Sequence, residues 1–206
     1  MDFKTEQEKF WADEFGNEYT SRNTGDELAA FNLSFFSKVF SRIGKPSSLI
    51  EFGCNRGLNL AAVKTLFPKT DLFGIEINKS AAEEASKIIG KENVHNGSIL
   101  EFEPTKKFEI SLIKGVLIHI NPDMLQAVYE KLYNASSKYI VIAEYYNPTP
   151  VEVPYRGHAG RLFKRDFAGE VLDKYPDLKL IDYGFCYRRD VAFPVDDATW
   201  FILEKK

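Results

Sequence analysis

The feature that most constrains the fold is a glycine turn between an apolar strand and a helix, in the stretch SSLIEFGCNRGLNLAAV at residues 47–63. The apolar run ends in Glu51, and a helical pattern begins a few residues later. Gly53 can adopt left-handed backbone angles that other residues avoid, and Gly57 allows a ligand to approach the backbone closely. The helix that follows presents free N–H groups and the positive end of its dipole. The pattern predicts an open α/β sheet with a ligand at the carboxyl end of its first strand.

Strand and helix patterns alternate along most of the chain. A helix is expected at 27–43, and Pro46 follows it. The expected strands then cover 47–52, 71–77, 93–98, part of 108–120 and 138–146, and the expected helices cover 57–67, 81–89, 122–135 and 164–175. Asn78 or Ser80 can cap the 81–89 helix, and Gly90 ends it. Such alternation is typical of a parallel sheet with helices on both faces.

The end of the chain departs from this alternation. Two further strands, at 178–190 and 198–205, follow each other too closely for a helical crossover, so we expect them to pair antiparallel. The predicted fold is therefore α/β, with a mostly parallel seven-stranded sheet, an antiparallel last strand and helices on both faces.

Composition limits the class of protein. The 206 residues suit one domain with a sizeable core, and 44% hydrophobic with 28% charged residues is typical of a globular chain. The formal net charge of −3 argues against a nucleic-acid partner. Two cysteines, Cys54 and Cys186, indicate neither a disulfide framework nor a metal site. No apolar run suits a membrane span, and the charged start is no secretory signal, so a cytoplasmic location is expected.

The glycine turn fits one nucleotide-binding pattern better than another. A dinucleotide fold needs Gly-x-Gly-x-x-Gly, but counting from Gly53 the middle position is Asn55 and the last is Leu58. An NAD-dependent oxidoreductase is therefore the weakest alternative. The stretch Glu51-Phe-Gly53-Cys-Asn55-Arg-Gly57 instead resembles motif I of class I S-adenosylmethionine-dependent methyltransferases, with Asn55 in place of a glycine. Asn tolerates left-handed angles better than other side chains.

The resemblance implies a Rossmann-like fold, S-adenosyl-L-methionine as cofactor, and a role for several residues. Glu51 is implied to accept a hydrogen bond from the methionine ammonium, directly or through water. Glu76, about twenty residues after the turn, can accept the ribose hydroxyls; the alternative is an acid that is only solvated at the strand end. Many methyltransferases carry, where this chain has Ser98, an acid that contacts the adenine amino group, so the resemblance implies that backbone groups, Ser98 and Ile99 hold the adenine here. The implied cofactor residues are Trp11, Tyr19, Arg22, Glu51, Gly53, Asn55, Gly57, Glu76, Ile77, Gly97, Ser98, Ile99, Lys114, Gly115 and Val116.

Two further stretches are similar to the methyltransferases associated with pseudaminic acid biosynthesis: EKFWADEFGNEYTSRN near the start, and AEYYNPTPVEVPYRGHAGRLFKRDFAGE after the fifth strand. The first carries Trp11, Phe15 and Tyr19 at helical spacing, which suits either core packing or a lid over the cofactor. Arg22 and Asn23 could then hold the methionine carboxylate. We expect one domain over 1–206, with a helical lid segment at 1–45 and a Rossmann-like core at 46–206.

The segment after the fifth strand begins at the expected ligand edge of the sheet. Its prolines and glycines argue against a regular element, and a long loop in a compact domain is usually functional. Its cations suit a small anionic acceptor, or else form a charged surface paired with Glu152, Asp166 and Glu170. The expected acceptor-binding residues are Tyr145, Tyr146, Asn147, Tyr155, Arg156, Arg161 and Lys164, and Arg165 belongs to the same basic cluster.

Methyl transfer from a sulfonium needs mainly alignment and removal of water. A hydroxyl acceptor would also need a base, and His119, His158 and Glu144 are the candidates. A carboxylate or amine acceptor would need none. Three alternatives stay open: an acceptor that is a sugar acid or nucleotide sugar, an acceptor that is a peptide or protein carboxylate, and a non-catalytic protein that only binds the cofactor. The oligomeric state is not specified by the sequence.

Overall fold

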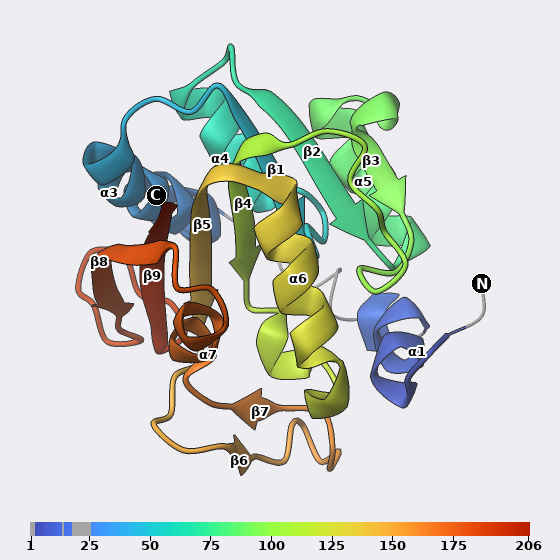
Figure 1. The fold of residues 1–206 in the computed structure, drawn as a ribbon. Helices are drawn as coiled ribbons and strands as arrows, with labels where there is room; N and C mark the ends of the chain where they lie inside the picture. Colours follow the sequence, from blue (N-terminus) through green and yellow to red (C-terminus); the bar gives the residue numbers. More distant parts are fainter. Residues whose placement is uncertain (1–2, 14, 18–25) are drawn as a thin grey trace.

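The computed structural model describes residues 3–13, 15–17 and 26–206 and contains a seven-stranded sheet in the order β3-β2-β1-β4-β5-β9-β8 (Figure 1). The first five strands of the chain are parallel, and β9 runs antiparallel to both β5 and β8. This confirms the predicted sheet and its antiparallel last strand. The strands are β1 (Ser48–Phe52), β2 (Asp71–Glu76), β3 (Val94–Asn96), β4 (Phe108–Lys114), β5 (Ser136–Glu144), β8 (Leu178–Cys186) and β9 (Ala198–Lys205).

Helices cover both faces of this sheet, as predicted. In Figure 1 α6 and α7 lie in front of the sheet, while α3 and α4 lie behind it. The helices are α1 (Glu6–Ala12), α3 (Asp26–Ile43), α4 (Leu58–Leu66), α5 (Lys79–Ile89), α6 (Leu125–Ala135) and α7 (Phe167–Lys174), with short 3-10 turns η1 (Lys91–Asn93), η2 (Leu117–His119) and η3 (Pro122–Met124). Asn78, rather than Ser80, caps α5 by accepting the N–H of Ala81, and Gly90 ends this helix.

Each face of the sheet has its own apolar core. The α3 side is built from aromatic side chains at helical spacing, and Phe31, Phe35, Phe36 and Phe40 are all at most 5% exposed. The α6 side packs Tyr129 and Leu132 against strand residues such as Ile113 and Ile142. Burying a side chain of this size contributes roughly 1.5–3 kcal/mol. The two layers therefore fix the sheet whose carboxyl edge carries the cavity described below.

The segment between β5 and α7 differs from the prediction, which excluded regular structure there. Its ends pair as two short antiparallel strands, β6 (Val151–Glu152) and β7 (Phe163–Lys164). The pairing continues through the N–H of Val153, which donates to the carbonyl of Leu162 at 2.9 Å. The prolines flank β6, and the glycines lie in the turn between the strands, so neither interrupts the pairing.

The amino-terminal helix is shorter than the spacing of its aromatic residues suggests. α1 ends at Ala12, where Asp13 adopts extended angles, so Phe15 is not on the same helix as Trp11. The two rings still meet edge to face, with centroids 5.4 Å apart. Tyr19, Arg22 and Asn23 lie outside the described residues. Within the described part of the chain, no helix is both long and apolar enough to cross a membrane.

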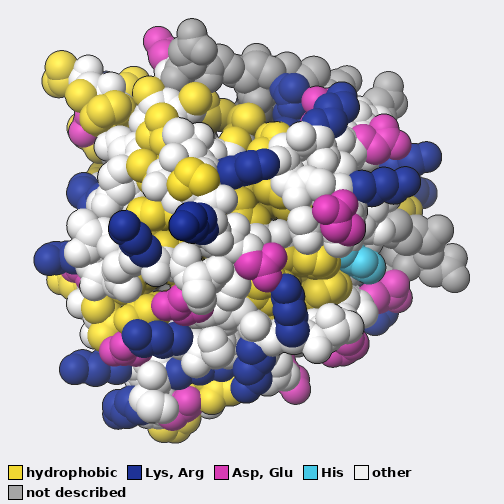
Figure 2. Space-filling view, turned by 90° about the horizontal axis from the view of Figure 1, so that it is seen from above, with side chains coloured by type: hydrophobic (Ala, Val, Ile, Leu, Met, Phe, Trp, Pro, Cys, Tyr) yellow, Lys and Arg dark blue, Asp and Glu magenta, His cyan; other side chains and the backbone are white. Residues whose placement is uncertain are grey.

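The end of the molecule at which the parallel strands begin carries positively charged, negatively charged and hydrophobic side chains. Figure 2 views the structure from above, onto the end of the sheet where the parallel strands begin. Lys and Arg side chains alternate there with Asp and Glu, and hydrophobic side chains lie between them. Opposite charges interspersed in this way create no extended field of one sign on this end.

Candidate functional site

A cavity of about 270 Å³ lies at the carboxyl ends of the parallel strands. This is close to the lower limit of about 300 Å³ for small-molecule pockets. Ten of the residues that the sequence nominated for the cofactor or for catalysis line it: Trp11, Gly53, Asn55, Glu76, Ile77, Ile99, Lys114, Gly115, Val116 and His119. Glu51, Gly57, Gly97 and Ser98 lie behind this lining, in contact with residues that form it.

The turn after β1 has the backbone that its glycines suggested. Gly53, Asn55 and Gly57 all have positive φ angles, of 74°, 48° and 77°. A Cβ added to Gly53 would lie 2.6 Å from Cγ2 of Val116, so only glycine fits at this point. Asn55 tolerates its left-handed angles better than most side chains would. The turn is thus held close against the segment that follows β4.

Glu76 fastens this turn to the end of β2. Its Oε2 accepts the N–H of Asn55 at 2.7 Å, and its Oε1 accepts the N–H of Asn78 at 2.8 Å. The side chain is 8% exposed, and burial raises the pKa of its carboxyl despite these bonds. A carboxylate offers about four lone-pair positions, so Glu76 keeps acceptor capacity toward the cavity.

Glu51, Asn59 and Lys114 form a buried polar cluster under the cavity floor. Asn59 donates to Oε1 of Glu51 at 2.5 Å, whereas Oε2 of Glu51 and Oδ1 of Asn59 are buried acceptors with no hydrogen-bond partner among the described residues. Burial raises the pKa of Glu51 to about 7. The half-buried ammonium of Lys114 lies 5.5 Å from the centre of the Phe31 ring, and desolvation lowers its pKa while Glu51 opposes that shift.

Glu144, one of the three proposed bases, binds the backbone beside the cavity. Its Oε1 accepts the N–H groups of Val116 and Leu117, each at 2.9 Å, and its Oε2 accepts that of Ile118 at 3.5 Å. The side chain is 3% exposed, and burial raises the pKa of its carboxyl to about 7. The carboxylate of Glu144 therefore faces the turn that carries Val116, and Glu144 does not line the cavity.

His119, the second proposed base, does line the cavity and is held firmly. Its Nδ1 lies 2.6 Å from the carbonyl oxygen of Arg161, which can only accept, so Nδ1 carries the proton. Burial lowers the pKa of His119 to about 4 and keeps the ring neutral near pH 7. Nε2 is then an unprotonated acceptor. The rings of Trp11 and Tyr155 pack beside the imidazole, at centroid distances of 4.4 and 5.0 Å.

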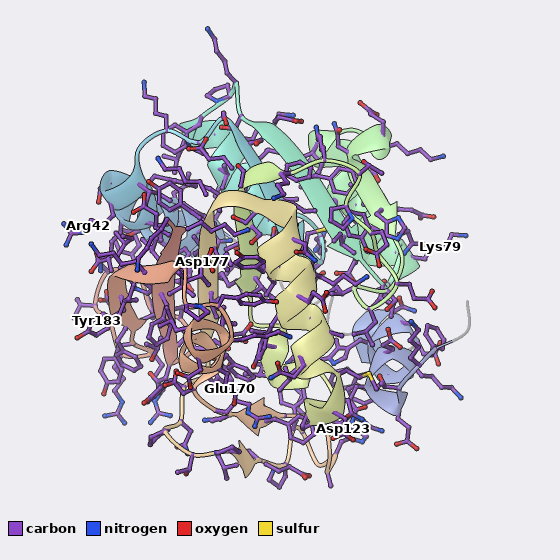
Figure 3. The ribbon with its side chains drawn as sticks, viewed as in Figure 1. Arg42, Lys79, Asp123, Glu170, Asp177 and Tyr183 are labelled. Carbon is purple, nitrogen blue, oxygen red and sulfur yellow. The ribbon has the colours of Figure 1, made fainter. Side chains whose placement is uncertain are left out.

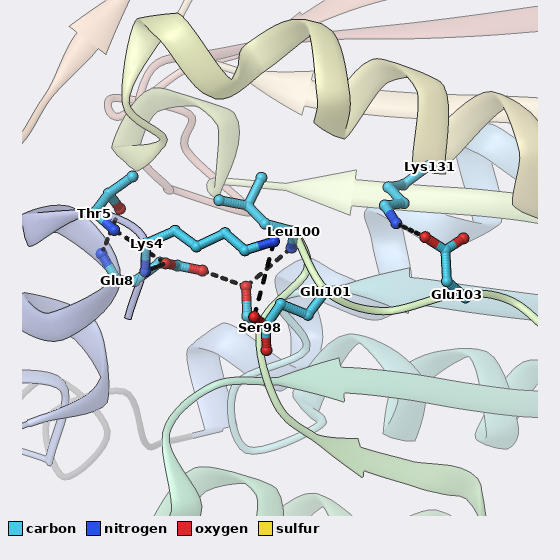
Figure 4. Close-up of polar contacts among 8 residues, drawn as sticks. All are labelled: Lys4, Thr5, Glu8, Ser98, Leu100, Glu101, Glu103 and Lys131. Carbon is cyan, nitrogen blue, oxygen red and sulfur yellow. Dashed lines mark hydrogen bonds and ion pairs between the residues drawn. The ribbon is translucent and has the colours of Figure 1, made fainter. Parts of the chain in front are cut away.

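The helix α1 closes one side of the cavity through residues that the sequence did not single out. Gln7 and Glu8 are at most 9% exposed and line the cavity with Trp11. The hydroxyl of Ser98 donates to Oε1 of Glu8, and the N–H groups of Lys4 and Thr5 donate to Oε2 (Figure 4). Asn78 adds bonds from its Nδ2 to the carbonyls of Trp11 and Ala12.

The residues predicted to bind the acceptor do not line this cavity. The hydroxyl of Tyr145 donates to Asp196, and the ammonium of Lys164 lies over the Tyr145 ring. His158, the third proposed base, is exposed and packs against Phe10. Tyr146 is 43% exposed, and Arg156 is exposed as well. The side-chain amide of Asn147 donates to the carbonyl of Thr149, and the Tyr155 ring packs on His119. Nη2 of Arg161 lies 3.4 Å from Oε2 of Glu6.

One ion pair in the segment between β5 and α7 agrees with the alternative that its cations form a charged surface paired with nearby acids. Arg165 lies 2.7 Å from Glu170, which is labelled on α7 in Figure 3. Asp166 caps α7 by accepting the N–H of Gly169, and Glu152 accepts the N–H of Gly160. Part of the predicted cationic cluster is thus committed to the fold, whereas Arg161 and Lys164 keep a side toward solvent.

Other cavity residues come from segments that carried no recognisable motif. Leu28 and Asn32 belong to α3, while Val195 and Asp196 belong to the connection between β8 and β9. Asn32 is 1% exposed, and its Oδ1 has no hydrogen-bond partner in the described structure. The available signal was an asparagine directly between Phe31 and Leu33. No group of three or more His, Cys, Asp or Glu side chains among the described residues could hold a metal ion.

The fold is similar to that of solved methyltransferases. The magnesium protoporphyrin IX methyltransferase of Synechocystis PCC 6803 with bound S-adenosylhomocysteine superposes with a TM-score of 0.70 at 11% identity, over 97% of each chain. The 1,6-didemethyltoxoflavin-N1-methyltransferase of Burkholderia thailandensis gives 0.69 at 16% identity, over 97% of this chain and 87% of that one.

The plantazolicin methyltransferase BpumL, solved with a pentazolic desmethylPZN analogue and S-adenosylhomocysteine, gives a TM-score of 0.68 at 15% identity, over 97% of this chain and 94% of that one. No protein-family model matches the chain, and no curated protein matches it in sequence. At these identities the similarity is one of fold, so the activity has to be argued from the site itself.

Proposed function

We propose that this protein is an S-adenosyl-L-methionine-dependent methyltransferase that acts on a small anionic acceptor. One observation carries the proposal: the positive-φ turn after β1 and Glu76 line one cavity at the carboxyl edge of the sheet, and the carboxylate of Glu51 lies directly behind that lining, bonded to Asn59, which is part of it. The neighbouring strand ends place Glu51 on β1 and Glu76 on β2. This order suits a ligand whose amino-acid part lies over β1 and whose ribose lies over β2.

Two buried acceptors, one on Asn59 in the cavity lining and one on Glu51 directly behind it, fit this cofactor. Oε2 of Glu51 and Oδ1 of Asn59 have no donor among the described residues, and leaving a buried acceptor unpaired costs about 1–3 kcal/mol. An ammonium group brings three donors and would satisfy both atoms. Glu76 would accept from the ribose hydroxyls with its remaining lone pairs, while Ile77, Ile99 and Val116 supply apolar walls for the base.

The cofactor supplies a methyl group on a sulfonium, and the chain's own residues then have to align an acceptor and exclude water. Trp11 and His119 form one wall in which the neutral imidazole offers Nε2 as an acceptor. A hydroxyl acceptor could donate to this nitrogen. Glu144 and His158 are less suited to a base role, because Glu144 holds the 116–118 backbone and His158 lies outside the cavity lining.

The anionic character of the acceptor is supported by Lys114. Lys114 lines the cavity, and none of the ion pairs within 4 Å among the described residues includes it. Lysine is rarely withdrawn from water unless it is paired, so an anionic ligand group is the partner we expect. A sugar acid or nucleotide sugar of the pseudaminic acid type would bring such a group. The ammonium of Lys164 lies over the Tyr145 ring, and Tyr145 donates to Asp196, which lines the cavity.

The experiment has two stages. Calorimetric titration with S-adenosylhomocysteine tests the cofactor site, and absence of binding would refute the proposal. Methyl transfer from labelled cofactor is then measured with sugar acids, with nucleotide sugars and with peptides that carry carboxylates. Lys114→Met should raise KM for an anionic acceptor more than tenfold, since hydrogen bonds to charged groups contribute roughly 1.5–3 kcal/mol. A peptide acceptor, or cofactor binding without transfer, would identify one of the alternative functions.

A further inference from the structure

Glu8 occupies an unusual place for a carboxylate on a terminal helix. Its side chain is 8% exposed, and it lines the cavity between the α1 segment and the turn that follows β3. Ile99 and Leu100, from that turn, line the same part of the cavity. Carboxylates are almost never buried to this degree without partners, so the contacts of Glu8 need an account.

The hydrogen bonds of Glu8 leave room for one more donor. Oε2 accepts the N–H of Lys4 at 2.7 Å and that of Thr5 at 3.2 Å, and Oε1 accepts the hydroxyl of Ser98 (Figure 4). A carboxylate has about four lone-pair positions, so three donors leave one of them open. Ser98 in turn accepts the N–H of Leu100 at 3.0 Å. The serine hydroxyl is therefore committed on both sides and positions Glu8.

The order of strands places this carboxylate at the base end of the ligand. Under the proposed function the amino-acid part lies over β1 and the ribose over β2. The next strand outward is β3, and the turn that follows it carries Ser98, Ile99 and Leu100. A nucleoside that extends beyond Glu76 therefore brings its base to Ile99 and Glu8.

We propose that Glu8 reads the adenine of the cofactor by accepting a hydrogen bond from its exocyclic amino group. The inference rests on the proposed function and adds the specificity-determining residue. The N–H of Ile99 donates to no acceptor within the described residues, so it is available to the ring nitrogen beside that amino group. An acceptor at Glu8 next to a donor at Ile99 matches adenine. The same pair opposes hypoxanthine, whose oxygen at that position would face the carboxylate.

This assignment ties base recognition to the position of α1. Glu8 belongs to the capping box of α1, in which Thr5 and Glu8 bond each other's backbone N–H groups. The helix is attached to the core near the nucleoside by Asn78, and farther away by Gln7, whose Nε2 donates to the carbonyl of Gly160 at 3.0 Å. Adenine is read only while these contacts hold the helix in place.

The test compares binding of S-adenosylhomocysteine with binding of S-inosylhomocysteine, in which an oxygen replaces the amino group. Calorimetry on the full chain should show that the wild type prefers the adenosyl compound roughly ten- to a hundredfold, as expected for a hydrogen bond to a charged group. Glu8→Gln should bring this ratio close to one, because an amide can present either its oxygen or its NH₂ group. Glu83→Gln, at an exposed position of α5, removes a carboxylate that makes no printed contact with α1 or the cavity; it is the matched control and should keep the wild-type ratio.

The outcomes separate the two proposals. If the wild type binds neither compound, the proposed function fails and this inference with it. If the wild type binds S-adenosylhomocysteine but Glu8→Gln leaves the preference unchanged, Glu8 does not read the base. Should Glu8→Gln not fold, as judged by its thermal melt, Glu8→Asp withdraws the carboxylate by one methylene and should lower the preference while it keeps the charge. Ser98→Ala should weaken binding but retain a preference for adenine.

Discussion

Replacing Glu51 by glutamine should stabilise the protein without ligand and weaken its binding of the cofactor. Burial raises the pKa of the Glu51 carboxyl from an ordinary 4.5 to about 7. The folded state therefore holds the proton more tightly than the unfolded state. The favourable contribution of the protonated form is complete below pH 4.5 and is lost as pH rises through 7. At about 1.4 kcal/mol for each tenfold change in proton affinity, the loss at pH 8 approaches about 3 kcal/mol.

Glutamine keeps the oxygen that accepts from Asn59 and carries no charge at any pH. Glu51→Gln should therefore raise the free energy of unfolding at pH 8 by as much as about 3 kcal/mol, and by close to nothing at pH 4.5. Urea denaturation at both pH values, without ligand, measures the difference. Glu109→Gln, at the exposed opposite end of the sheet, serves as a control for general charge effects. A variant that is equally destabilised at both pH values would refute this reasoning.

Two further predictions concern the walls of the cavity. Gly53→Ala should destabilise the fold by about 2–5 kcal/mol, because alanine resists the left-handed angles and its Cβ would lie 2.6 Å from Val116. Adding Val116→Ala in the same chain should recover the steric part of this loss. Gly44→Ala, at φ 84° with nothing within 4 Å of the added Cβ, should lower the free energy of unfolding by only about 1–2 kcal/mol. Chemical denaturation measures all three, and equal losses at the two glycines would contradict the steric argument. The His119 ring should stay neutral from pH 8 to pH 5, because burial lowers its pKa to about 4; an NMR titration, assigned with His119→Asn, would contradict this if the resonance moved near pH 6.5.

The sheet and its nucleotide turn could be predicted because each depends on local sequence. An apolar strand before Gly53 and a helix after Gly57 leave few conformations for the residues between them, and the structure shows the expected positive φ angles. Glu76 was equally accessible, since a strand end in a parallel sheet places its acid at the ligand edge. The antiparallel ending followed from the short connection between β8 and β9.

The contacts that close the cavity could not be predicted in this way. Glu8 and Ser98 meet across 90 residues, and nothing in either stretch specifies the other. Glu144 illustrates a second difficulty: its position at a strand end suggested a base, but the turn after β4 provides three N–H groups that bind its carboxylate. The segment between β5 and α7 illustrates a third difficulty, because a cation such as Arg165 is paired with Glu170 on α7. Sequence identifies candidate chemistry, whereas long-range packing determines which groups face a ligand.

The contacts of α1 with the β6–β7 region also bear on the timing of any turnover. Gln7 donates a hydrogen bond to Gly160, Glu6 lies near Arg161, and Phe10 packs against His158, so α1 and the β6–β7 region are attached to each other beside the cavity. Under the proposed function, a bound nucleoside would leave more readily once these contacts loosen. In enzymes built like this, release of the spent product commonly limits the overall rate. Loosening a single hinge contact far from the reacting atoms would then speed the cycle, even though it adds nothing to the chemistry.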